Sequence, residues 1–190
     1  ARVVSNMALR LATHARRSDA GWERDGALVV VSADHTRLLD ATHVAPTLQH
    51  ALEHWPRVRP ALEALQATLD ADGGDERLPA NARAFDAAEL AAPLPRAYAW
   101  LDGSAYINHV ELVRKARGAE VPACFYTSPL MYQGGSDGFL APLAPIEADD
   151  EEWGIDFEGE IGVIVDDVPA GASASDAAEH IRLIVLLNDV

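Results

Sequence analysis

Residues 154–165 read GIDFEGEIGVIV, and this stretch constrains the fold more than any other part of the chain. Its second half is nearly all aliphatic, as in a buried strand, but carboxylates occupy every second position of its first half: Asp156, Glu158 and Glu160. Because a strand turns alternate side chains to one face, these like charges would line one side and repel one another. The fold must supply water, protonation or a cation on that side.

The E-x-E spacing alone leaves two interpretations open. The simpler one is an amphipathic strand whose carboxylates face solvent. Asp156 begins the strand, so we expect it at an exposed edge and take Glu158 and Glu160 as the centre of the pattern. Burial of both without compensation would cost several kcal/mol or force protonation. Mg²⁺ and Mn²⁺ prefer carboxylate oxygens and would remove the repulsion.

Two further stretches favour the cation. The apolar strand pattern IRLIVLLNDV ends in Asp189. A carboxylate at the end of an apolar strand is costly unless another group compensates its charge. WLDGSAYINH places Asp102 at a strand-to-helix junction, with His109 seven residues further on. An imidazole would then lie beside a set of oxygen ligands from three predicted strands. These ligands are Asp102, Glu158, Glu160 and Asp189.

The N-terminal half predicts a small α/β domain over residues 1–95. Helical spacing runs from Leu48 to Leu69 around a break at Pro56, and it stops at Gly73–Gly74. An Ala/Pro-rich segment, residues 87–97, is typical of a linker to a second domain. Short apolar runs predict strands in three places: residues 7–12, 27–32 and 36–40.

The second domain is predicted over residues 96–190. RAYAWLDG, residues 96–103, predicts a strand, and a helix follows with Ser104 as its N-cap and Gly118 as its stop. Phe157, Ile161 and Val163 are expected to pack on the face of their strand opposite the carboxylates. The acidic run EADDEEW is expected to face water. The predicted class is therefore α+β and rich in strands.

Charge and composition exclude several kinds of partner. The net charge of −15 argues against a surface for nucleic acid or anionic membranes, which require excess Lys and Arg. No apolar run reaches the roughly 18 residues that a membrane span needs. The single cysteine, Cys124, excludes an internal disulfide and suits a reducing compartment. We therefore predict a cytoplasmic protein with no nucleic-acid or membrane partner.

A second metal interpretation rests on His50, Glu53 and His54, which spell the inverted zinc-protease pattern H-x-x-E-H. However, Pro56 ends that helix early, and no later acidic helix offers a third ligand. A solvated helix face is the better interpretation of these three residues.

The combined motifs resemble the fumarylacetoacetate hydrolase family, whose catalytic part corresponds to residues 98–190. That family has an aspartate seven residues before a catalytic histidine, a D-x-E-x-E strand, and a later strand that ends in Asn-Asp. This sequence offers Asp102 and His109, residues 156–160, and Asn188–Asp189 in that order. The resemblance implies a divalent cation (Mg²⁺, Mn²⁺ or Ca²⁺), His109 as the catalytic residue and Tyr126 as the substrate-facing tyrosine.

The same resemblance implies a fold and an activity. Residues 96–190 would form the N-terminal portion of a mixed β-roll, so we expect a chain truncated after the Asn-Asp strand, and a homodimer. The expected enzyme is a hydrolase acting on carbon–carbon bonds in ketonic substances, with a role in aromatic catabolism. Its substrate would be a 1,3-diketo acid of the fumarylacetoacetate or acylpyruvate type. The metal would stabilise the developing enolate, and His109 would activate water.

Alternatives remain open on the same residues. A 2-oxo acid hydratase, decarboxylase or isomerase would use the same fold and metal, and a non-catalytic metal-binding protein would need only the carboxylates. The exact substrate is undetermined because Ser128 precedes Pro129 where many bacterial relatives have lysine. For the arginine that some members use on the substrate carboxylate, Arg114 and Arg117 are the nearest candidates.

Overall fold

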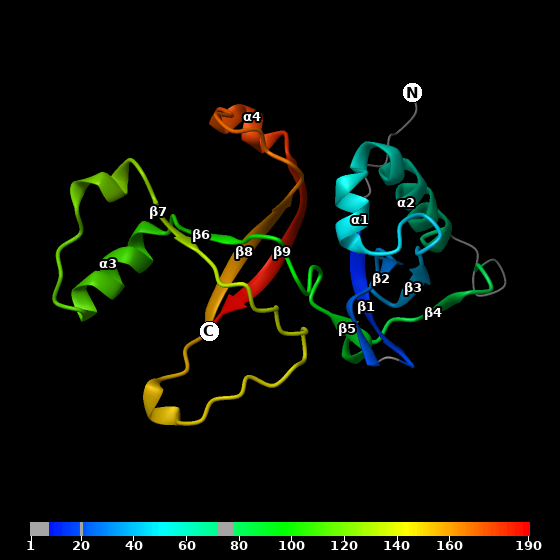
Figure 1. Ribbon diagram of the computed structural model, residues 1–190, viewed down its shortest axis with the longest axis horizontal. Coiled ribbons are helices and arrows are strands. Elements are labelled where there is room, and N and C mark those ends of the chain that lie inside the picture. Colours follow the sequence, from blue (N-terminus) through cyan, green and yellow to red (C-terminus); the bar gives the residue numbers. More distant parts are fainter. Residues whose placement is uncertain (1–7, 20, 72–77) are drawn as a thin grey trace. The chain divides into compact units, whose positions relative to one another are not determined.

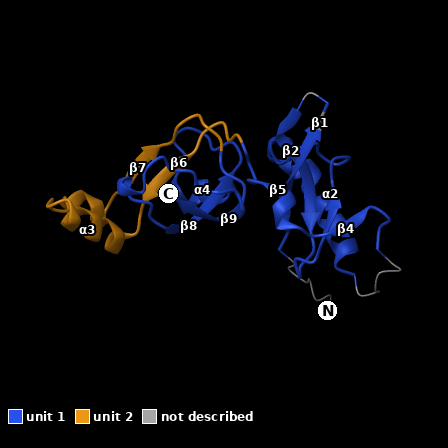
Figure 2. Ribbon diagram, turned by 90° about the horizontal axis from the view of Figure 1, so that it is seen from below, with its two compact units in different colours: residues 1–95, 139–190 blue, residues 96–138 orange. Residues whose placement is uncertain are grey.

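The computed structural model describes residues 8–19, 21–71 and 78–190 of the chain (Figure 1). They form two compact units: unit 1 comprises Ala1–Pro95 and Phe139–Val190, and unit 2 comprises Arg96–Gly138 (Figure 2). The predicted α+β, strand-rich class is confirmed, while the division into domains at residues 95 and 96 stays a prediction. Among the described residues, no helix combines the length and the apolar character that a membrane crossing requires.

The first part of unit 1 is a five-stranded antiparallel sheet with the order β4-β3-β2-β1-β5. The segment predicted as a linker is partly in this sheet, because β5 pairs with β1. The first strand begins later than predicted, since residues 7–10 precede it and residue 7 lies outside the described part. The strands are β1 (Leu11–Ser18), β2 (Gly21–Val31), β3 (Arg37–Asp40), β4 (Ala82–Ala84) and β5 (Leu90–Ala91).

Two helices, α1 (Leu48–Glu53) and α2 (Trp55–Leu69), pack on this sheet (Figure 1). The Thr47 side chain caps α1 by accepting the backbone N–H of His50 at 3.1 Å. Pro56 lies in the first turn of α2, where its missing N–H has no intrahelical partner to lose. The predicted stop at Gly73–Gly74 lies outside the described residues. The shared core includes Leu28, Val30, Leu48, Leu52, Trp55, Val58 and Leu62.

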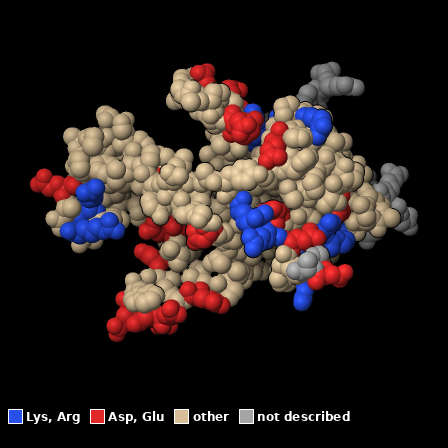
Figure 3. Space-filling model, in the orientation of Figure 1, with Lys and Arg blue, Asp and Glu red and all other residues tan. Residues whose placement is uncertain are grey.

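The second part of unit 1 contains the hairpin of β8 (Glu158–Val165) and β9 (Ile181–Asp189), connected through the short helix α4 (Ala174–Ala178). A capping box of Ser173 and Asp176 begins α4. The acidic run before β8 includes the 3₁₀ turn η4 (Glu151–Trp153), and its carboxylates are exposed as predicted. Figure 3 shows acidic side chains gathered over this segment.

Unit 2 consists of the hairpin of β6 (Leu101–Ser104) and β7 (Leu130–Gln133), with α3 (Ile107–Ala116) and the 3₁₀ turn η3 (Ala123–Tyr126) between the two strands (Figure 2). The predicted N-cap is wrong. Ser104 is the last residue of β6, where it pairs with Leu130, and Tyr106 takes the cap position. Gly118 follows the helix with φ of 65°, in keeping with its predicted role as the stop.

A close approach of Trp100 to Gly134 makes unit 2 sensitive to a single methyl group. A Cβ atom at residue 134 would lie 1.8 Å from Cε2 of Trp100, whose indole N–H donates to the backbone oxygen of Gly135 at 3.1 Å. We expect Gly134→Ala to lower the free energy of unfolding by about 1–3 kcal/mol, the usual cost of overpacking. Urea denaturation measures the loss. Because the clash is with the indole, Trp100→Ala and Gly134→Ala should be less than additive, and strict additivity would contradict the explanation.

Candidate metal centre

Three carboxylates meet at one end of the β8–β9 hairpin. The strand register places Glu158 directly opposite Asp189, and Glu160 follows on the same face of β8. One side-chain oxygen from each of the three lies within 4.8 Å of the others. Glu158 and Glu160 are half-buried, and Asp189 is exposed. These residues are three of the four metal ligands predicted from the sequence.

The chemistry of this cluster fits a hard divalent cation. Like charges at such a separation repel each other by on the order of 1–4 kcal/mol per pair, depending on the effective dielectric constant. Two like charges on residues that lie directly across from each other in an antiparallel pair also destabilise the pairing of the strands. A cation bound between the oxygens turns this repulsion into attraction, and an all-carboxylate donor set suits Mg²⁺, Mn²⁺ or Ca²⁺ better than zinc.

The face that carries the carboxylates becomes apolar further along the hairpin. Ile164 and Leu183 lie on that face and pack against the core of unit 1. Between them and the carboxylates is Gly162, where a Cβ atom would lie 2.8 Å from Cδ2 of Leu187 and 2.9 Å from Cγ1 of Val185. Glycine at 162 therefore lets the β9 side chains lie over β8 beside the carboxylate cluster.

The opposite face of the hairpin is exposed, although it was predicted to be packed. Phe157, Ile161 and Val163 were expected to pack, but they are 76%, 62% and 53% exposed. Across the ladder from Ile161 and Val163, Leu186 and Ile184 are exposed as well. Alternation in a strand shows which residues share a face but does not show which face is covered. We call these five side chains the apolar hairpin face.

Two residues beside the cluster have backbone roles. Asp156 was predicted to stay out of the metal shell, and its Oδ1 accepts the N–H of Phe157 at 2.7 Å. The sequence marks Asn188 only as part of the Asn-Asp motif. Its Oδ1 accepts the backbone N–H of Glu158, the first residue of β8, at 2.9 Å. No local sequence pattern indicates this contact, because the two residues are thirty positions apart.

The remaining predicted site residues lie in unit 2. Asp102 is on β6, half-buried and paired with Tyr132 of β7. His109 is exposed in the first turn of α3, and Tyr126 is exposed at the end of η3. The Tyr126 hydroxyl donates to Oε1 of Glu111 at 2.9 Å. Glu111 was not among the predicted site residues, although it lies two residues after His109 on the same helix.

The Glu111 contact has a measurable effect on Tyr126. The hydrogen bond to Glu111, together with its charge, raises the pKa of the Tyr126 phenol above its ordinary value of 10.0. We expect Glu111→Gln to lower that pKa back toward 10, because glutamine carries no charge. Tyrosinate absorbance measured against pH, with Tyr126→Phe to identify the residue, gives the shift. Glu120→Gln, at another exposed glutamate of unit 2, should leave the titration unchanged. No shift in Glu111→Gln would contradict this assignment.

A second polar cluster joins the other ends of β8 and β9. Nδ1 of His180 lies 2.6 Å from Oδ1 of Asp166, and Nε of Arg182 donates to Oδ2 at 2.7 Å. Partial burial by itself raises the pKa of Asp166, but the hydrogen bonds from His180 and Arg182 and the charge of Arg182 lower it to below its ordinary value. The cluster stabilises the connection through α4 and was not predicted.

Asp166 makes stability depend on pH in the acid range. The pKa of Asp166 in the folded protein lies below its unfolded value of 3.8. Its contribution to the free energy of unfolding is therefore complete above pH 4, and it is lost as the pH falls through the folded pKa. We expect the melting temperature of Asp166→Asn to depend less on pH below 4 than that of the wild type. The control is Asp167→Asn, which changes an exposed neighbour. Parallel pH profiles for wild type and Asp166→Asn would contradict the linkage.

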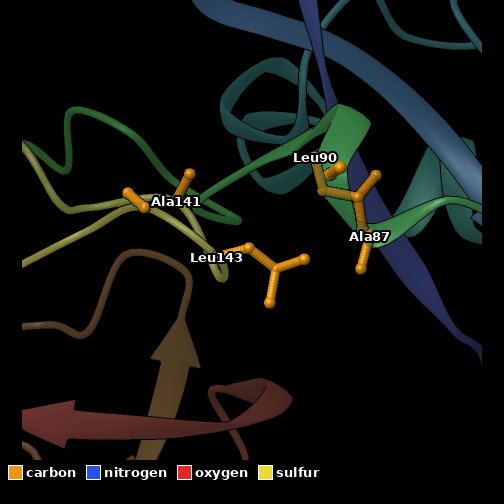
Figure 4. A pocket seen from close by; sticks show the side chains of 6 residues that line it. Ala87, Leu90, Ala141 and Leu143 are labelled. Atoms are coloured by element: carbon orange, nitrogen blue, oxygen red, sulfur yellow. The ribbon is translucent and has the colours of Figure 1, made fainter.

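Among the described residues, neither the predicted H-x-x-E-H residues nor a hollow in unit 1 adds a second candidate centre. His50 lies in α1 and His54 lies between α1 and α2, and their rings are 4.4 Å apart between centroids, tilted by 45°. Within the described ranges, the Glu158–Glu160–Asp189 cluster is the only group of three or more candidate metal ligands. A hollow in unit 1 of about 200 Å³ is lined only by alanine and leucine, so it holds no side chain for catalysis (Figure 4).

Comparison with known proteins adds a family to this geometry. A family model described as "Fumarylacetoacetase N-terminal domain 2" matches residues 9–96. A second model, described as "Fumarylacetoacetate (FAA) hydrolase C-terminal", matches residues 99–190, which carry all of the predicted site residues. The two matches together span nearly the whole chain. No curated protein matches the sequence.

Proposed function

Because the chain belongs to the fumarylacetoacetate hydrolase family, a family of enzymes with hydrolase- and hydratase-type activities, we propose that it is a metal-dependent hydrolase of a 1,3-diketo acid. The substrate would be of the fumarylacetoacetate or acylpyruvate type. The observation that carries the proposal is the convergence of Glu158, Glu160 and Asp189 on one face of the hairpin. A site for a hard cation suits substrates with adjacent carbonyl and carboxylate oxygens.

Four residues would hold the cation in this proposal. Glu158, Glu160 and Asp189 contribute the clustered oxygens, and Asp102 of β6 is proposed as the fourth ligand. A divalent cation held there would act as a Lewis acid toward the carbonyl oxygens of the substrate. Tyr126 is proposed to face the substrate. Its hydroxyl proton points to Glu111, which leaves the oxygen available as an acceptor.

His109 is proposed as the general base. It would take a proton from a water molecule, whose oxygen adds to the carbonyl carbon remote from the carboxylate. The carbon–carbon bond next to that carbonyl then breaks, and its electron pair becomes the enolate of the leaving oxo acid, which is a 2-oxo acid for an acylpyruvate and a 3-oxo acid for fumarylacetoacetate. Protonation of the enolate carbon completes the reaction, so one diketo acid and one water give a carboxylic acid and that oxo acid.

Turnover assays test the proposal. Protein made from the complete reading frame that carries this sequence would be incubated with acetylpyruvate or fumarylacetoacetate, with Mg²⁺ or Mn²⁺ or with EDTA. We expect loss of the diketo absorbance only with metal, and the two carboxylic acids as products. A product with the carbon skeleton intact would instead indicate a hydratase or isomerase, and release of CO₂ a decarboxylase. Bound metal without turnover of any 2-oxo acid would favour a binding role.

A further inference from the structure

We propose that Asn188 is a positioning residue for the cation site, which it serves by holding Glu158 in register with Asp189; this inference rests on the proposed function of the same site. The contact that carries it is the 2.9 Å hydrogen bond from the backbone N–H of Glu158 to Oδ1 of Asn188. Of the two groups of the asparagine amide only the oxygen accepts a hydrogen bond, so Oδ1 is the end of the Asn188 amide that faces Glu158.

The place of this contact explains why it is needed. Glu158 is the first residue of β8 and Asp189 the last of β9, so the ladder ends at this pair. Their carboxylates face each other across the strands, and like charges opposite one another favour separation. The end of a hairpin also frays readily, because backbone groups there have few neighbours. The amide of Asn188 opposes both effects at the residue that must stay closest to Asp189.

Asn188 can do this without entering the cation site. It lies opposite Gly159 in the ladder, so its side chain starts from the face opposite to that of Glu158 and Asp189. Gly159, opposite Asn188, carries no side chain, and the Phe157 ring lies over it, with Cε1 3.3 Å from where a Cβ atom of residue 159 would be. The Asn188 amide reaches the backbone N–H of Glu158, the residue before Gly159. A neutral acceptor is also suited to this position, because an aspartate would add another negative charge beside the cluster.

Binding of Mn²⁺ tests the consequence for the site. We expect Asn188→Ala to weaken Mn²⁺ binding about tenfold or more, which is the usual effect of removing a residue that orients a ligand. Water-proton relaxation of the Mn²⁺-loaded protein should rise, because a misplaced Glu158 leaves a coordination position to water. Leu186→Ala removes an exposed side chain on the same face of β9 and should change neither quantity. Unchanged affinity and relaxation in Asn188→Ala would overturn the inference.

Amide hydrogen exchange tests the contact itself in metal-free protein. The Glu158 amide should exchange faster in Asn188→Ala than in the wild type, and Asn188→Asp, which keeps an acceptor oxygen, should restore protection. Equal exchange in wild type and Asn188→Ala would overturn the inference. The proposed function fails in a different way: the wild type would bind Mn²⁺ but turn over no 2-oxo acid, and the Asn188 effects would remain. A wild type that binds no Mn²⁺ would overturn both.

Discussion

Glu160→Gln is expected to weaken Mn²⁺ binding by about a hundredfold or more, which is about 2.7 kcal/mol of binding free energy. Glutamine keeps the shape of the side chain but removes a charge from a donor set of three carboxylates within 4.8 Å of one another. A hard cation binds most strongly to charged oxygens, so the loss of one negative charge lowers the affinity for Mn²⁺ directly. Isothermal titration with Mn²⁺ measures the effect, and turnover at limiting metal should fall with it.

The same variant should have the opposite effect on metal-free protein. Removing one of three mutually repelling charges relieves repulsion, so metal-free Glu160→Gln should melt at a higher temperature than the metal-free wild type. Excess Mn²⁺ should reverse the order, because the cation stabilises only the form that binds it well. Glu152→Gln makes the same change in net charge at an exposed residue of η4 and should show neither effect. Equal Mn²⁺ affinity for Glu160→Gln and wild type would rule out this site.

His109→Ala is expected to lower turnover of the diketo acid by about 10²–10⁴-fold, the range typical of a lost general base. His109 lies in the first turn of α3 and is exposed, so its removal should affect chemistry more than folding. Steady-state kinetics at saturating Mn²⁺ measure the loss. Affinity for Mn²⁺ should not change, because the imidazole is not among the proposed ligands.

The control for this variant is Leu112→Ala, an exposed apolar residue of the same helix. It should keep both turnover and Mn²⁺ affinity. If His109→Ala kept full activity, the general base would have to be another group. If it lost Mn²⁺ binding as well, the role of His109 would be structural or as a ligand.

The parts of the site that could be predicted are those with a local pattern. Glu158 and Glu160 share a face because a strand has a period of two, and the apolar run before Asp189 marks a strand end. Glu158 and Glu160 meet Asp189 because β8 and β9 pair in the antiparallel direction. The Asp166–His180–Arg182 cluster could not be predicted in this way, because its members are separated by fourteen and sixteen residues and follow no period.

Two departures from the sequence-based expectations have a common physical cause, which is strand pairing that overrides local preference. Ser104 is a favoured N-cap residue, but pairing with Leu130 keeps it in β6. The Ala/Pro-rich segment looked like a linker, yet Leu90 and Ala91 form β5 because β1 presents an edge to pair with. A strand of two residues is too short to show a period.

The apolar hairpin face also governs the colloidal behaviour of the protein. The chain carries a net charge of −15, so at low ionic strength the molecules repel one another. Salt shortens the range of that repulsion from about 30 Å at 0.01 M to about 8 Å at 0.15 M. Attraction between uncovered aliphatic side chains is then unopposed. The ionic strength of the buffer therefore sets how far this repulsion keeps the apolar hairpin faces of two molecules apart.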